Sequence, residues 1–250
     1  MSEAFVKRAS ELATKLDSRI VLALDPIFNP YRSRRIAYRS RERFEVSEGA
    51  KRLLLELRGL VPGVKMGLPI MIGLGPDEVE NIVSVYKKRY FFICDLKMAD
   101  IGHINRLVAE QVFGLGFDAI IIHAAIGARE GIDRVVELAN DMNKGVLGLC
   151  AMSHPGAGEL LNKNFNKLLS IAASAGVDGF VLPATYPKLI TCARRAHPSK
   201  LVFSPGVGSQ GACFGSALSA GADFEIIGRS IAQAPSPVEK VKEILRVMRG

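Results

Sequence analysis

The sequence lacks the patterns that mark membrane, zinc-binding or disulfide-stabilised proteins. No uninterrupted apolar run reaches the length needed to span a bilayer. The four cysteines show no Cys-x-x-Cys spacing, and the histidines show no zinc spacing. The first fifteen residues mix acidic and basic side chains in a helical pattern. We therefore expect reduced thiols, no metal site, no membrane association and a cytoplasmic location.

The composition also lacks any break that would mark a linker between domains. With 250 residues, of which 48% are hydrophobic and 23% charged, the chain is typical of a soluble globular protein. This length is sufficient for one large core or two small ones. We expect a single domain that covers residues 1–250.

Positive charge is concentrated in one segment of this basic chain, which has a formal net charge of +8. Glu42 is the only acidic residue among six closely spaced arginines: Arg32, Arg34, Arg35, Arg39, Arg41 and Arg43. Such a patch could contact nucleic acid, an acidic partner or only water. No aromatic-interleaved RNA motif or helix-turn-helix signature surrounds it, so we expect no nucleic-acid function. The interpretation we favour is a solvated insertion at about residues 29–48.

Short apolar runs alternate with amphipathic stretches, which is typical of βα units and a parallel sheet. No internal sequence repeat is visible beyond this rhythm. Helical stripes such as Val79, Ile82, Val83 and Tyr86 lie between the runs. The predicted strands lie near residues 20–24, 64–66, 90–94, 119–122, 146–149, 179–182, 201–204 and 224–227. About eight strands predict an α/β fold of the closed (β/α)8 TIM-barrel type.

A doubly wound open sheet is the competing architecture, and polar residues help to choose between the two. Reactive or backbone-permissive residues follow nearly every predicted strand, namely Asp25, Lys65 with Gly67, Asp95 with Lys97, His123, Ser153, Pro183 with Thr185, Pro205 with Gly206, and Gly228 with Arg229. A barrel displays such residues in a ring on its catalytic face. An open sheet would concentrate them at one switch point, so the pattern favours the barrel.

The most informative stretch is the apolar run from Phe91, which ends in an Asp-x-Lys-x-x-Asp cluster. Alternation along a strand places Asp95 and Lys97 on the same face, and Asp100 follows as the chain turns outward. With Lys65 from the preceding strand, these residues form an alternating array of charges. A substrate anion pressed against a carboxylate would be destabilised, and the Lys97 ammonium could stabilise a carbanion and then protonate it. A purely structural ion-pair network is the alternative.

A phosphate site is predicted near the end of the chain. The loop 204–211 is rich in glycine and follows a strand, and Gly228 and Arg229 follow the last strand. Backbone N–H groups and a guanidinium are suited to a phosphate dianion, and barrels usually bind phosphate after strands seven and eight. Ser153 has no nucleophile elbow around it, so polar recognition of a ring is its better role. For His123 we favour a structural hydrogen bond over a general base or metal ligand.

Together these motifs resemble the orotidine 5′-phosphate decarboxylase family, in particular its compact archaeal and bacterial type. The resemblance covers nearly the whole chain, and its motifs occur in the same order. They are Leu22-Ala23-Leu24-Asp25, Val64-Lys65-Met66-Gly67, Asp95-Leu96-Lys97-Met98-Ala99-Asp100-Ile101, Met152-Ser153-His154-Pro155-Gly156-Ala157, the loop 204–211 and Ile227-Gly228-Arg229-Ser230-Ile231. A joint accidental match of six motifs is improbable.

The resemblance implies a lyase of de novo pyrimidine biosynthesis that converts orotidine 5′-phosphate to UMP and CO₂ without metal or organic cofactor. Asp25 and Lys65 would hold ribose hydroxyls, and Asp95 would sit against the substrate carboxylate. Lys97 would protonate C6 of the pyrimidine. The catalytic residues implied are therefore Lys65, Asp95, Lys97 and Asp100.

The resemblance also implies a homodimer with two shared active sites. Asp100 and Ile101 would be donated to the neighbouring subunit's site. Ser153 would read the pyrimidine, and Pro205 with its loop would cover it. Phosphate would be held by Gln210, Gly228 and Arg229. The chain departs from the family pattern where His103 and Ile104 replace a common Asn-Thr pair.

Two alternatives remain open from the sequence. One is a metal-dependent sugar-phosphate decarboxylase or aldolase on the same barrel, a group that resembles this chain in its Asp-x-Lys-x-x-Asp strand. In that group an acidic residue stands where this chain has Lys65, and an ammonium would repel the metal. The other is an inactive relative that binds nucleotides or nucleic acid through the arginine segment, against which the intact charged array argues.

Overall fold

The computed structural model describes residues 3–25 and 40–249. Arg32, Arg34, Arg35 and Arg39, and with them most of the expected insertion, lie outside the described residues. Arg41 and Arg43 belong to the first turn of helix α2 (Ser40–Glu56). The described part of the expected insertion is therefore the beginning of a regular helix. No helix in the described ranges is long and apolar enough to cross a membrane.

The described residues form a closed barrel of eight parallel strands, which confirms the predicted fold and rules out the open sheet. Each strand pairs with the next one, and β8 pairs with β1. The strands are β1 (Ile20–Ala23), β2 (Gly63–Gly67), β3 (Phe91–Met98), β4 (Ala119–His123), β5 (Gly145–Leu149), β6 (Gly179–Val181), β7 (Leu201–Pro205) and β8 (Phe224–Ile227). Strand β3 is longer than we predicted and carries both Asp95 and Lys97.

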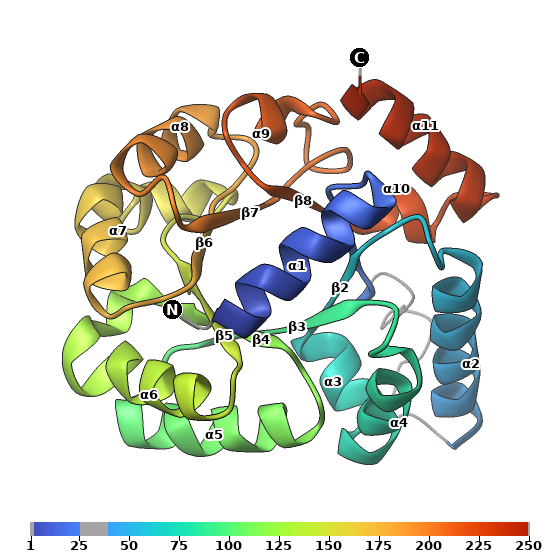
Figure 1. Ribbon diagram of the computed structural model, residues 1–250, viewed down its shortest axis with the longest axis horizontal. Helices are drawn as coiled ribbons and strands as arrows, with labels where there is room; N and C mark the ends of the chain where they lie inside the picture. Colours follow the sequence, from blue (N-terminus) through green and yellow to red (C-terminus); the bar gives the residue numbers. More distant parts are fainter. Residues whose placement is uncertain (1–2, 26–39, 250) are drawn as a thin grey trace.

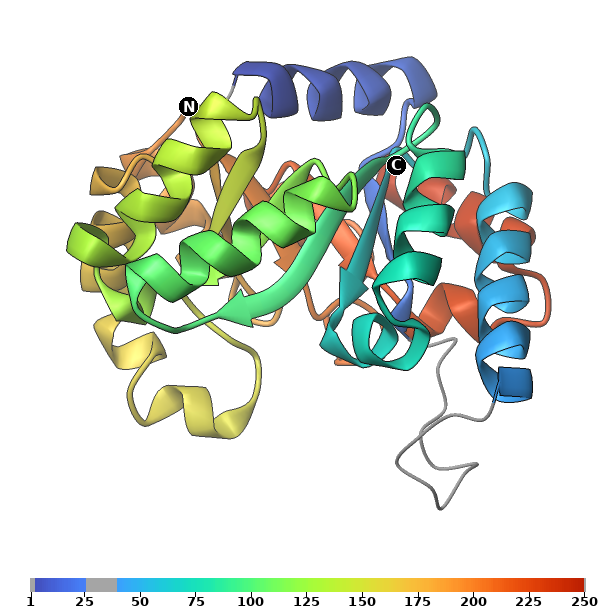
Figure 2. The same cartoon turned by 90° about the horizontal axis from the view of Figure 1, so that it is seen from below.

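Helices cover the outside of the barrel (Figures 1 and 2). They bury the apolar stripes expected from the sequence, as Val79, Ile82 and Val83 in α4 (Pro76–Tyr86) illustrate. The other helices after α2 are α3 (Leu68–Leu74), α5 (Gly102–Gly114), α6 (Asp133–Asp141), α7 (Phe165–Ser174), α8 (Pro187–Ala196), α9 (Ser216–Ser219), α10 (Arg229–Ala232) and α11 (Pro237–Arg249). Within the described residues, short 3-10 turns lie at residues 124–126, 155–158 and 162–164, and an irregular turn lies at 128–132.

Helix α1 (Glu3–Leu16) lies across one end of the barrel (Figure 1). Phe5 on this helix is fully buried and packs against the rings of Phe91 and Phe203. There is no room for a side chain at Gly145, because its Cβ would collide with the Phe5 ring. The helix therefore closes the amino-terminal end of the strands and leaves the carboxyl-terminal end for a functional site.

A short repeat that the sequence analysis missed ties the strands together. Each of three strands is preceded by Gly-x-Asp, and the aspartate exchanges hydrogen bonds with the first residues of the preceding strand. The Asp118 carboxylate accepts the N–H of Phe92 at 2.8 Å, and the Asp178 carboxylate accepts that of Val146 at 2.8 Å. The Asp223 carboxylate accepts the N–H of Val202 at 2.7 Å. The aspartates thus satisfy strand N–H groups at the closed end of the barrel, where an unpaired buried N–H would be costly.

We predict that Phe5→Ala lowers the free energy of unfolding by about 3–5 kcal/mol, because it leaves a cavity among fully buried rings. Urea unfolding followed by circular dichroism measures the change. The matched control is Phe44→Ala, since Phe44 is 66% exposed and its truncation should change the free energy by less than about 0.5 kcal/mol. Equal effects of the two substitutions would show that α1 does not seal the barrel.

Candidate active site

The candidate site is a cavity of about 340 Å³ at the carboxyl ends of the strands. It brings together nine residues expected there from the sequence: Asp25, Lys65, Asp95, Lys97, Ser153, Pro205, Gln210, Gly228 and Arg229. The remaining lining residues are mostly apolar and include Ile121, Leu149, Val181, Val207 and Ile226. A mostly apolar cavity with a few convergent polar groups is the usual form of a small-molecule site.

The charges on one side of the cavity alternate in sign along three neighbouring strands. The Lys65 ammonium lies 2.8 Å from an Asp25 oxygen and 3.1 Å from an Asp95 oxygen. On the other side of Asp95, the Lys97 ammonium donates to both carboxylate oxygens at 2.9 Å. The resulting order is Asp25, Lys65, Asp95, Lys97. Each buried charge therefore has an opposite charge in contact with it, as the low dielectric of this region requires.

Strand geometry explains how these four side chains meet. Asp25 lies two residues after the end of β1, while Lys65 lies in β2 and Asp95 in β3, and these strands are consecutive neighbours in the barrel. Lys97 has a backbone φ of +47°, and the register between β3 and β4 shifts at this point. A positive φ is strained for a residue with a side chain, and such strain clusters at functional sites. The irregular end of β3 keeps Lys97 against Asp95.

Burial and charge act in opposite directions on this array. Burial opposes ionisation of Lys65, but the charges of Asp95 and Asp25 outweigh it and raise the Lys65 pKa above its ordinary 10.5. Burial likewise opposes ionisation of Asp95, but Lys65 and Lys97 outweigh it and hold the Asp95 pKa below its ordinary 3.8. Both groups are therefore charged throughout the neutral pH range.

Gly67 allows the Asp25 carboxylate to approach the backbone of β2. Its N–H donates to Asp25 Oδ1 at 2.7 Å, and a Cβ at this position would lie 2.6 Å from the same oxygen. No other residue type fits without displacing the carboxylate. Gly67 and Lys65 thus fix Asp25 from two sides and leave its carboxylate at the cavity wall.

The loop expected to bind phosphate, residues 204–211, begins at the end of β7, precedes α9 and lines the cavity. Gln210 and Arg229 both line the cavity, and Ser153 Oγ donates to Gln210 Oε1 at 2.7 Å. This hydrogen bond joins the loop after β5 to the loop after β7. Behind the loop, the fully buried Glu225 accepts backbone N–H groups of Gly215 and Ala217 at 3.0 and 2.9 Å. The loop therefore has a fixed anchor at its far end.

Sequence analysis missed several residues of the cavity. Ser209 and Val207 belong to the glycine-rich loop and line the cavity, and that loop was the available signal for them. Apolar residues such as Ile121 gave no signal, because an inward strand residue at the site looks like any other core residue. His123 forms the structural hydrogen bond we favoured, since its Nδ1 accepts the Ala125 N–H at 3.4 Å.

Asp100 and Ile101 do not line the cavity of their own chain, so this chain alone brings together only part of the predicted array. Asp100 is exposed, and its carboxylate accepts the N–H of Ile101 at 2.7 Å. The Ile101 side chain is 66% exposed. Asn105, which the sequence analysis did not single out, is buried beside them and bonds to the Asp100 backbone.

The donor set of the cavity does not suit a divalent cation. Asp25 and Asp95 are the carboxylates that could hold one there, but the Lys65 ammonium already lies between them. A cation placed there would meet the ammonium at close range, which is repulsive. This arrangement disfavours the metal-dependent sugar-phosphate alternative on the chemistry of the residues present.

We predict that Asp95→Asn lowers the free energy of unfolding by about 3–5 kcal/mol at pH 7, because it removes the carboxylate between two ammonium groups. The pKa of Asp95 in the folded protein lies below its ordinary value of 3.8. The ionised carboxylate therefore contributes fully to the free energy of unfolding above pH 3.8, and this contribution is lost as the pH falls through the pKa of the folded protein. The difference between variant and parent should therefore shrink in acid. Urea unfolding at pH 7, 4 and 3 measures it.

The control for this prediction is Asp141→Asn, because Asp141 is exposed on the surface. We expect it to change the free energy of unfolding by less than about 0.5 kcal/mol at each pH. A loss for Asp95→Asn that stayed constant between pH 7 and 3 would contradict the assignment of the effect to the charge.

Comparisons with known proteins show the family of the chain. The sequence model of the orotidine 5′-phosphate decarboxylase / HUMPS family matches residues 18–244. The chain is 37% identical over 198 residues to the orotidine 5′-phosphate decarboxylase of Methanosarcina mazei, and this match covers 79% of this chain and 88% of the relative. It is 36% identical over 187 residues to that of Aeropyrum pernix, with coverage of 74% and 76%.

Solved structures show the same architecture. The chain is similar to orotidine 5′-monophosphate decarboxylase of Metallosphaera sedula, with 32% identity, a TM-score of 0.75 and coverage of 93% of this chain and 98% of that one. The enzyme of Methanocaldococcus jannaschii, complexed with the inhibitor BMP, gives a TM-score of 0.79 at 26% identity, with coverage of 93% and 99%. On this evidence the chain belongs to the orotidine 5′-phosphate decarboxylase / HUMPS family.

Proposed function

We propose that the protein decarboxylates orotidine 5′-phosphate to uridine 5′-phosphate and CO₂. The observation that carries this proposal is the alternating array of Asp25, Lys65, Asp95 and Lys97 in the same cavity as Arg229 and its glycine-rich loop. The array suits a reaction in which one negative charge leaves and another develops. The guanidinium and loop suit the phosphate of the same substrate.

The reaction needs electrostatic stabilisation, because loss of CO₂ leaves an electron pair on C6 that the pyrimidine ring delocalises poorly. In the proposed orientation the substrate carboxylate faces Asp95. Like charges about 4 Å apart repel by ~4 kcal/mol at an effective dielectric of ~20, and this repulsion ends when CO₂ departs. The Lys97 ammonium faces the developing carbanion, stabilises it and transfers one proton to C6.

Binding groups remote from the reacting carbon hold the substrate in that orientation. Asp25 and Lys65 would bind ribose hydroxyls, and Gln210, Gly228 and Arg229 would bind phosphate. Ser153 and Pro205 would contact the pyrimidine. Because the Ser153 hydroxyl already bonds to Gln210, phosphate binding and ring binding are linked through one contact. Such remote binding energy can be used to press the carboxylate towards Asp95.

Two chains are proposed to complete each site as a homodimer. The support for this is that Asp100 and Ile101 are exposed and do not line their own cavity, and that the segments after β2 and β3 carry exposed apolar side chains. These follow the neighbouring strands β2 and β3 and comprise Leu68, Ile72, Ile101, Ile104 and Leu107, which are 38–68% exposed. A second copy that covers this face would remove apolar area from water and bring Asp100 to the open side of Lys97.

The proposed reaction belongs to de novo pyrimidine biosynthesis and requires no cofactor. A cytoplasmic location is part of the same proposal. It is supported by the four cysteines, all of which are free, with Cys192 and Cys213 exposed. Free exposed thiols fit a reducing compartment.

We predict that the purified protein converts orotidine 5′-phosphate to uridine 5′-phosphate in the presence of a chelator, whereas Lys97→Ala loses at least about 10³-fold in kcat, because it removes both the stabilising charge and the proton donor. The loss of substrate absorbance measures turnover. Lys88→Ala, at an exposed position outside the cavity, is the matched control and should retain full activity. Absence of turnover by the parent protein would overturn the proposal.

We predict that Ile101→Asp converts a dimer into a monomer, because it places a charge in the apolar face proposed to pair with a second copy. Light scattering coupled to size-exclusion chromatography measures the mass. Val247→Asp on α11 is the control, since Val247 is also exposed but lies outside that face. A parent protein that is monomeric at micromolar concentration would contradict the shared site.

A further inference from the structure

The segment that carries Asp100 is exposed, yet its backbone is held from the inside by one buried side chain. Asn105 lies in the first turns of α5 and is 1% exposed. Its Nδ2 donates to the Asp100 carbonyl at 2.5 Å, and its Oδ1 accepts the Asp100 N–H at 3.3 Å. Both main-chain groups of Asp100 are thus bound by a single amide. Substitution by a charged or apolar residue would break at least one of these bonds.

The same segment is supported from the outside at Gly102. A Cβ at Gly102 would lie 2.5 Å from the carbonyl oxygen of Glu130 and 2.9 Å from Cγ of Arg134. The start of α5 is therefore in direct contact with the turn that precedes α6. There is no space here for a larger residue unless one of the two segments moves.

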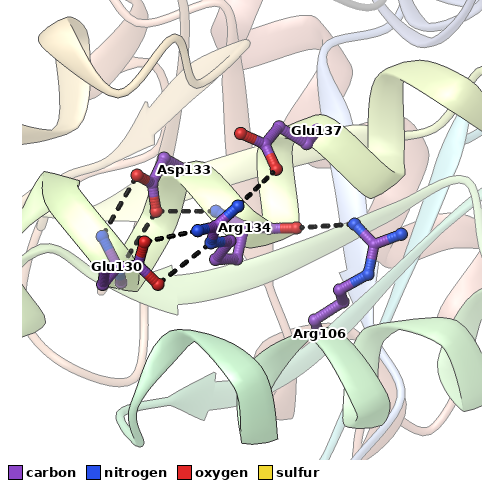
Figure 3. A network of polar contacts seen from close by, with 6 residues as sticks. Arg106, Glu130, Asp133, Arg134 and Glu137 are labelled. Atoms are coloured by element: carbon purple, nitrogen blue, oxygen red, sulfur yellow. Dashed lines mark hydrogen bonds and ion pairs between the residues drawn. The ribbon is translucent and has the colours of Figure 1, made fainter.

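The turn around Glu130 is itself fixed, although its conformation is strained. Glu130 has a φ of +51°, which is unfavourable for a residue with a side chain. Asp133 holds this conformation, because its carboxylate accepts the N–H groups of Glu130 and Gly131 at 3.1 Å each. Arg134 forms ion pairs with Glu130 and Glu137 on the outer side (Figure 3). Strain of this kind persists where the surroundings determine it and is a pointer to function.

From these contacts we propose that Asn105 is a positioning residue, which together with the Gly102 contact holds Asp100 and Ile101 in a fixed, outward conformation for the active site of the partner copy. This inference rests on the proposed decarboxylase and its shared site. A mobile carboxylate would lose conformational entropy when it enters a second chain. A carboxylate that is fixed in advance avoids this cost and keeps the geometry within the small tolerance that catalysis requires.

The first test compares Asn105→Ala with the parent protein. We expect a loss of about 10- to 100-fold in kcat, since small displacements of a catalytic group have effects of this size, while KM changes by less than about threefold because the remote binding groups are intact. Val112→Ala is the matched control for lost packing, because Val112 is buried on the same helix away from Asp100. It should lower the melting temperature and preserve kcat.

The second test places the two halves of a site on different chains. Asn105→Ala and Lys97→Ala subunits that carry different affinity tags are co-expressed, and the mixed dimers are isolated. One of their two sites combines an intact Lys97 with an Asp100 that is held by an intact Asn105. We expect about half of the wild-type activity per dimer, because one of two equivalent sites is complete. A role of Asn105 in the stability of its own chain would not give this recovery.

A third variant protects the test against misfolding of Asn105→Ala. Gly102→Ala disturbs the same segment from the other side without deleting a buried polar group, and it should show the same loss in kcat and the same recovery in mixed dimers. The inference is overturned if Asn105→Ala and Gly102→Ala keep full kcat, or if their mixed dimers are no more active than their own homodimers. An unmutated protein that shows no turnover would instead overturn the proposed function, and the inference with it.

Discussion

The site is organised around the buried ammonium of Lys65. This charge is stable only because Asp25 and Asp95 lie on either side of it at 2.8 and 3.1 Å. Both contacts require that β1, β2 and β3 be consecutive neighbours, and closure of the barrel provides this order. Gly67 must also lack a side chain so that Asp25 can approach the backbone. A change in strand order, in register or at Gly67 would leave a buried charge without its partner.

The two ends of the barrel have different tasks. At the amino-terminal end, α1 and the Phe5 ring exclude water, while the aspartates of the Gly-x-Asp repeat satisfy the strand N–H groups. At the carboxyl-terminal end, charged and polar groups face a cavity, and Lys97 adopts a strained backbone conformation. Stability from the closed end offsets the desolvation and strain at the open end. This separation allows the closed end to support the charged array at the open end.

The proposed mechanism also links chemistry to assembly. Of the four catalytic residues implied by the resemblance, a single chain brings Lys65, Asp95 and Lys97 together in its cavity, while Asp100 is exposed outside it. In the proposed dimer, the exposed apolar side chains after β2 and β3 would face the second copy, and Asn105 holds the Asp100 backbone beside them. In this proposed arrangement, dimer formation would supply a catalytic group as well as buried area. Free monomers would have the substrate cavity without the complete set of charges.

The sequence by itself determined the eight-stranded barrel, the approximate position of each strand and most of the charged and polar residues that line the cavity. It could do so because the apolar periodicity is local, and because polar residues at strand ends converge in any closed parallel barrel. Only the tertiary structure decided that Lys65 contacts both Asp25 and Asp95, that Phe5 closes the barrel, and that Asp100 lies outside its own cavity. The roles of Gly67, Asn105 and the Gly-x-Asp aspartates likewise depend on contacts between residues far apart in the fold or on the exact turn of the backbone. Such contacts arise from strand register and packing, which no local pattern of residues encodes.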